Sequence, residues 1–138
     1  MLCNKHIRKA FSLAIDRQAV VDTIGISNEM PAINFVPPAL KNGINTPYFP
    51  TVDIENAKKE LEIGLQETGL TKKDLETICL IYPQRENSNT LCQILQQQWL
   101  TNLGITIALE CLDFKIFLEN FSRRKNFFWI FKLLILFS

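Results

Sequence analysis

Residues 76–112 read ETICLIYPQRENSNTLCQILQQQWLTNLGITIALECL, and this stretch decides the fold class. The short apolar run at 76–82 suits a buried strand. Residues 90–102 repeat apolar side chains at helical spacing, and residues 105–112 alternate between two faces as a strand does. A strand, a helix and a second strand predict a βαβ unit with parallel strands and a right-handed crossover. We therefore expect an α/β fold.

Two helical patterns precede this unit. Residues 5–24 have the apolar periodicity of one amphipathic helix, and Gly25 follows as a stop signal. The carboxylate of Asp53 can accept N–H groups at the start of a second helix, which Gly69 ends. Residues 26–50 hold five of the six prolines, so the sequence predicts a long loop there.

One more helix is predicted after the unit, beginning at Asp113. Its expected inner face consists of Phe114, Phe117, Leu118 and Phe121. The basic run at 123–125 follows, at the helix end where the dipole favours cations. Such a run is usually solvated, but bidentate arginine contacts to a carboxylate are a second interpretation.

The composition excludes several kinds of function. The chain has 138 residues, with 15 Lys and Arg against 14 Asp and Glu, so a net charge of +1 gives no electrostatic reason to expect nucleic-acid binding. A hydrophobic fraction of 47% is typical of one globular domain. His6, the only histidine, is expected to be solvated.

Four cysteines lie far apart, without the close pairs that zinc sites use. They are Cys3, Cys79, Cys92 and Cys111, and we expect small buried side chains, with a disulfide as the alternative in an exported chain. No metal and no cofactor are predicted.

An enzyme is not expected. The sequence has no Gly-rich phosphate loop and no serine in a nucleophile elbow. Asp16 and Arg17 are adjacent on a predicted helix, so their side chains should make separate contacts rather than form a catalytic pair.

Neither end of the chain has the pattern of a targeting or membrane segment. The N-terminus lacks the apolar stretch of a signal peptide. Residues 127–138 are apolar except Lys132 and Ser138, but a membrane span needs about 20 such residues. A buried element, an interfacial segment and a wrongly translated tail remain open for this stretch.

Six segments, in order, resemble the C-terminal lobe of the family 5 extracellular solute-binding proteins, which are peptide-binding proteins of bacterial ABC importers. The segments are NKHIRKAFSLAIDRQAVV at 4–21, MPA at 30–32 with FVPP at 35–38, DIENAKKEL at 53–61, LIY at 80–82, QWLTNLGI at 98–105 and LDFKIFL at 112–118. The resemblance covers about residues 4–126.

This resemblance implies a partial lobe of a two-lobe, type II-like periplasmic-binding-protein fold, spanning residues 1–126. Two such lobes close around a peptide through contacts on both sides. The implied function is peptide capture for an ABC permease, without chemistry on the peptide. The implied location is the periplasm or cell envelope, although a fragment without a signal peptide could remain in the cytoplasm.

Site residues follow from the resemblance residue by residue. Phe114 matches an aromatic position that lines the peptide groove. Ser88 matches a region that approaches the C-terminal end of the peptide. Arg123 or Arg124 falls near an arginine that pairs with the peptide carboxylate.

The sequence departs from the family after residue 127. The family continues with a Gly-Trp-x-x-Asp-Tyr segment whose Asp binds the peptide amino group, whereas this chain has FWIFKLLILF at 128–137. We therefore expect a truncated or frame-shifted fragment that lacks its first lobe, binds peptide poorly and has a non-native tail at 127–138. The alternative is an interaction module whose tail docks on a partner protein or a membrane interface.

Overall fold

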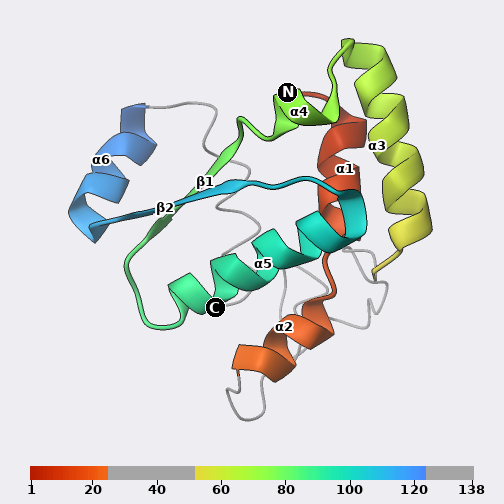
Figure 1. Ribbon diagram of the computed structural model, residues 1–138. Helices are drawn as coiled ribbons and strands as arrows, with labels where there is room; N and C mark the ends of the chain where they lie inside the picture. Colours follow the sequence, from red (N-terminus) through yellow and green to blue (C-terminus); the bar gives the residue numbers. More distant parts are fainter. Residues whose placement is uncertain (25–51, 124–138) are drawn as a thin grey trace, which may run out of the picture.

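The computed structural model describes residues 1–24 and 52–123 (Figure 1). These ranges contain six helices and two strands in the order α1 Lys5–Leu13, α2 Arg17–Ile24, α3 Ile54–Thr68, α4 Lys72–Leu75, β1 Cys79–Pro83, α5 Ser88–Leu103, β2 Ala108–Leu112 and α6 Phe114–Arg123. The predicted loop at 26–50 and the apolar tail at 127–138 lie outside the described residues.

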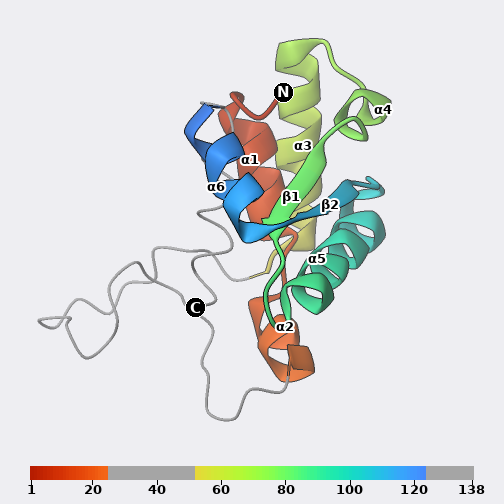
Figure 2. The same cartoon turned by 90° about the vertical axis from the view of Figure 1, so that its left-hand side faces the viewer.

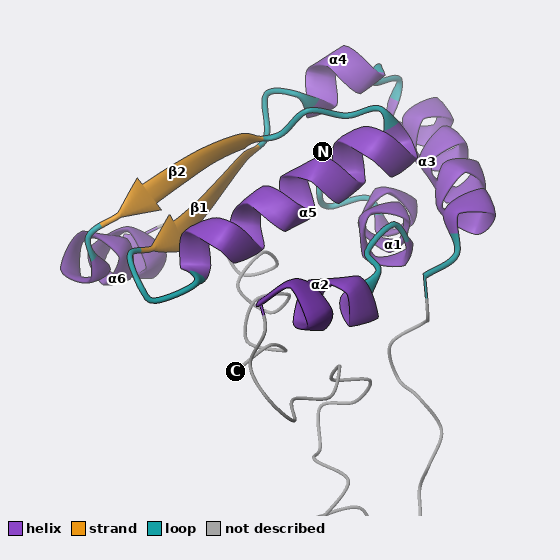
Figure 3. Ribbon diagram, turned by 60° about the horizontal axis from the view of Figure 1, so that its bottom comes forward, coloured by secondary structure: helices purple, strands orange, loops and turns teal. Residues whose placement is uncertain are grey.

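The βαβ unit is confirmed. β1 and β2 pair in parallel, with Cys79 opposite Ala108 and Pro83 opposite Leu112. Both strands begin three residues later than their patterns suggested. The helix that connects them, α5, lies along one side of the sheet (Figure 3). Leu80 and Tyr82 of β1 are buried in the core that α5 shares.

α1 and α3 form the second packed layer, side by side at the end of α5 (Figure 1). Gly64 permits their close approach, because a Cβ there would lie 2.6 Å from the Cγ1 atom of Ile7. Ala57 and Leu61 of α3 are buried against the same core. Asp53 and Gly69 bound α3 as predicted: the Asp53 carboxylate accepts the Asn56 N–H at 3.0 Å, and Gly69 has a φ of 67°.

The single helix predicted for residues 5–24 is wrong. The first helix ends at Leu13 and a second begins at Arg17, and side chains of α5 bind the backbone of this break. Asn102 donates to the carbonyl of Ala14 at 2.8 Å. Gln98 accepts the N–H of Asp16 at 2.9 Å and donates to the carbonyl of Asp16 at 3.2 Å. The bonds to the Ala14 carbonyl and the Asp16 N–H satisfy groups that a continuous helix would have paired internally, whereas the Asp16 carbonyl also accepts the N–H of Val20 at 3.2 Å.

Asp16 and Arg17, at the start of α2, make separate contacts, as the sequence suggested. The Asp16 carboxylate accepts the N–H of Ala19 at 3.1 Å and so caps α2. Arg17 is only 7% exposed and donates to the hydroxyl of Ser12 at 3.2 Å. Burial lowers the pKa of the Arg17 guanidinium. α2 packs beneath α5 (Figure 2).

The inner face predicted for α6 is only partly right. Phe117 is 1% exposed, but Phe114 and Leu118 are 40% and 46% exposed. Asp113 begins the helix as expected, because its carboxylate accepts the N–H of Lys115 at 2.9 Å. The side chain of Phe121 lies outside the described residues. Of the four residues expected on the inner face, the structure therefore shows only Phe117 to be buried.

The predictions for His6 and for two cysteines are wrong. His6 is half-buried and lies against Glu60, because α3 packs over the start of α1. Cys92 is buried, but Cys3 and Cys111 are exposed, since Cys3 precedes α1 and Cys111 lies near the end of β2. Burial is the main reason that the pKa of the Cys92 thiol rises to about 12. Among the described residues, no helix is both long and apolar enough to span a membrane.

Candidate functional site

The carboxyl ends of β1 and β2 lie at one edge of the sheet, because the strands are parallel (Figure 3). Beyond Pro83 the chain stays attached to this edge, since the N–H of Gln84 donates to the carbonyl of Leu112 at 2.8 Å. Open parallel sheets bind their ligands outside such carboxyl ends. We call the segment 84–88 together with residues 113 and 114 the carboxyl edge.

A stacked pair of side chains lies at the carboxyl edge. The guanidinium carbon of Arg85 is 4.6 Å from the ring centroid of Phe114, which is cation–π geometry, and both residues are exposed. Within the part of the chain that the structure describes, the Arg85 guanidinium makes no hydrogen bond or ion pair. Stacking on the ring limits its conformations, so its planar N–H groups can bind a carboxylate in bidentate fashion.

Ser88 belongs to the same edge. It is the half-buried first residue of α5, and its N–H donates to the carbonyl of Arg85 at 3.2 Å. Asn87 turns the chain there with a φ of 63°. Tyr82 fixes the turn to the strand by donating its hydroxyl to Asn89 at 2.6 Å. Burial raises the pKa of the Tyr82 hydroxyl, so it remains a neutral donor.

Of the two predicted arginines, the structure describes only the backbone of Arg123. Arg123 is the last residue of α6, about 13.5 Å along the helix axis from Phe114 at 1.5 Å per residue. Its side chain is outside the described residues, as is Arg124 altogether. The structure therefore brings Ser88 and Phe114 to one edge through Arg85. The roles expected of Arg123 and Arg124 remain predictions.

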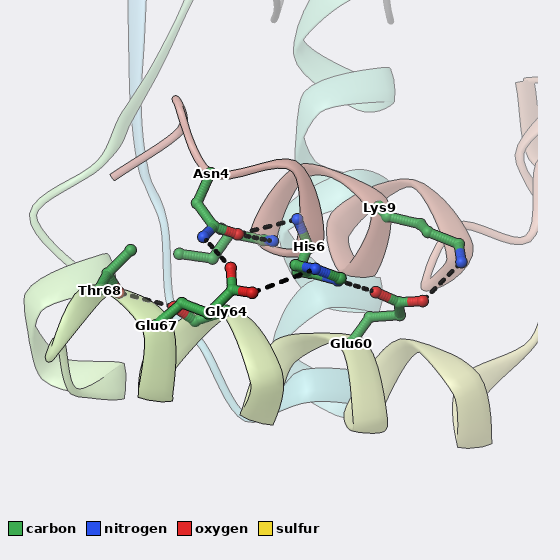
Figure 4. Close-up of polar contacts among 8 residues, drawn as sticks. Asn4, His6, Lys9, Glu60, Gly64, Glu67 and Thr68 are labelled. Atoms are coloured by element: carbon green, nitrogen blue, oxygen red, sulfur yellow. Dashed lines mark hydrogen bonds and ion pairs between the residues drawn. The ribbon is translucent and has the colours of Figure 1, made fainter.

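Away from the carboxyl edge, a network of polar side chains links α1 to α3 (Figure 4). The Nδ1 atom of His6 lies 2.6 Å from the Oε2 atom of Glu60, and Lys9 donates to the other oxygen of Glu60 at 2.5 Å. Asn4 donates to Glu67 at 2.8 Å. The hydrogen bonds from Lys9 and His6 lower the pKa of Glu60. All members of this network have protein partners, so its role is structural.

Two other features offer little for chemistry. Over residues 1–24 and 52–123, no group of three or more His, Cys, Asp or Glu side chains is arranged to hold a metal ion. A hollow of about 470 Å³ runs along α5, but its lining from that helix consists of Ile94 and uncharged polar residues such as Gln93 and Gln97.

Comparison with known proteins identifies the family. Residues 1–133 match the family described as bacterial extracellular solute-binding proteins, family 5 Middle. The chain belongs to this family. The oligopeptide-binding protein OppA of Bacillus subtilis is 35% identical over 121 residues, which are 86% of this chain and 22% of that protein. The periplasmic oligopeptide-binding protein OppA of Salmonella typhimurium is 26% identical over 115 residues, 83% of this chain and 21% of that protein.

Solved structures give the same fold. OppA of Burkholderia pseudomallei superposes with a TM-score of 0.71 at 23% identity, covering 86% of this chain and 24% of that one. The Escherichia coli murein tripeptide binding protein MppA superposes with a TM-score of 0.62 at 21% identity, covering 86% and 23%. The predicted α/β fold, as part of a periplasmic binding protein, is confirmed. This family 5 chain spans about a fifth of the length of the curated relatives it matches.

Sequence reasoning missed Arg85 in this family 5 chain. For residues 84–89 the sequence indicates only a polar connection after the first strand. A usable signal is present, because an arginine two residues after a strand in a βαβ unit lies near the carboxyl edge. Its stacking on Phe114 had no such signal, since the two residues are far apart in sequence.

Proposed function

We propose that this chain is one portion of an oligopeptide-binding protein that serves peptide uptake by an ABC transporter. The observation that carries this proposal is the 35% identity to the oligopeptide-binding protein OppA of Bacillus subtilis across 86% of the chain. Because the similarity extends over nearly the whole chain, it supports a shared role in binding oligopeptides. The proposed location is the periplasm or cell envelope, because the OppA relatives of Salmonella typhimurium and Escherichia coli are periplasmic oligopeptide-binding proteins.

The carboxyl edge is the part of this chain that we propose to contact peptide. Arg85 would pair with a peptide carboxylate, and the ring of Phe114 would both hold Arg85 and cover apolar peptide atoms. Ser88 would offer its hydroxyl as a hydrogen-bond partner. Arg123 and Arg124 remain proposed carboxylate partners on the sequence resemblance alone. None of these roles requires a nucleophile or a general base, so the peptide would be bound and released unchanged.

The chain by itself should bind peptide weakly. A two-lobe clamp holds its ligand through contacts on both lobes, and one portion offers only some of these contacts without closure. The proposed partners are therefore the rest of a family 5 protein, including its first lobe, and an ABC permease. We also propose that residues 127–138 do not contribute to peptide binding, because the Gly-Trp-x-x-Asp-Tyr pattern is missing there.

A chimera tests this function. Residues 4–126 would replace the matching region of Bacillus subtilis OppA, and peptide binding would be measured by isothermal titration calorimetry beside the chain alone. We expect the chimera to bind oligopeptides, and the chain alone to bind at least about 100-fold more weakly. A chimera that shows native circular dichroism but binds no peptide would refute the proposed function. Tight binding by the chain alone would refute the claim that it needs the remaining portion.

A further inference from the structure

We draw no further inference here: the strongest candidate, the exposed apolar surface of α6 formed by Phe114, Ile116 and Leu118 beside the carboxyl edge, carries none because nothing in the part of the chain that the structure describes shows what covers it.

Discussion

The Gln98→Glu substitution probes the hydrogen bonds that hold the break between α1 and α2. The Gln98 amide accepts from the N–H of Asp16 at 2.9 Å and donates to the carbonyl of Asp16 at 3.2 Å. A carboxylate of nearly the same shape keeps the first bond but cannot make the second, because it has no donor. An oxygen would then face the carbonyl oxygen of Asp16, which keeps its hydrogen bond from the N–H of Val20 at 3.2 Å but loses the one from Gln98.

The expected cost is about 1–2 kcal/mol in the free energy of unfolding. One neutral hydrogen bond contributes roughly 1 kcal/mol, and repulsion between the new carboxylate oxygen and the Asp16 carbonyl oxygen adds to this loss. Since small domains are stable by about 5–15 kcal/mol, the variant should still fold. The loss should shrink below about pH 4, because a protonated carboxyl group can donate again.

The matched control is Gln97→Glu on the same helix. Gln97 is exposed and, among the described residues, its side chain donates only to the hydroxyl of Thr101 at 3.2 Å, so the same change in charge should alter stability by less than about 0.5 kcal/mol. Urea unfolding followed by circular dichroism at pH 7 and pH 4 measures both variants. Equal stability of the two variants at pH 7 would refute the role we assign to Gln98 at the break.

Three further predictions concern packing, pH dependence and thiol reactivity. Gly64→Ala should lower the free energy of unfolding by about 1–2 kcal/mol, since the new methyl group overlaps Ile7 by more than the gain in helix propensity offsets; a rise in stability on urea unfolding would contradict the close packing. Glu60 has a pKa lowered by its hydrogen bonds, so it contributes stability above its unfolded pKa of about 4.3 that is lost as pH falls through the folded value. Glu60→Gln should therefore make the free energy of unfolding fall less steeply as the pH is lowered. An equally steep fall in the variant and in the unchanged protein would count against the network. The pKa of Cys92, about 12, predicts that this buried thiol reacts slowly with a disulfide reagent at pH 8. The number of fast-reacting thiols should therefore be the same in Cys92→Ser as in the unchanged protein. A decrease would show that Cys92 is accessible.

Local patterns were sufficient for the parts of the fold that depend on nearby residues. The strand, helix and strand of the βαβ unit follow from periodicity, and α3 lies between a capping Asp53 and Gly69 as its sequence indicates. The short helix α4 was missed, although Asp74 accepts the N–H and hydroxyl of Thr71 in a pattern that is visible in the sequence. A helix of one turn has too little periodicity to be recognised in any other way.

Long-range contacts explain the features that the sequence could not predict. Apolar spacing continues through residues 14–16 and hides a break that Asp16 favours locally as the cap of α2, and side chains of α5 more than 80 residues later bind the backbone there. His6 was expected at the surface because no local pattern indicates that Glu60 lies against it. At the carboxyl edge, the resemblance pointed to Ser88 and Phe114, whereas the stacking of Arg85 emerges only when β1 and β2 are paired.

The most direct test of the central claim measures how the carboxyl edge recognises a peptide carboxylate. The chimera and its Arg85→Gln variant would each be titrated with one oligopeptide carrying a free carboxylate and with its C-terminal amide. Lys115→Gln, which removes a neighbouring exposed charge, serves as the control. A charge-assisted contact to Arg85 predicts a loss of roughly 10-fold to 100-fold in affinity for the free carboxylate and little change for the amide. Equal losses for both peptides, or no loss for either, would contradict the assignment of Arg85 and the carboxyl edge to peptide binding.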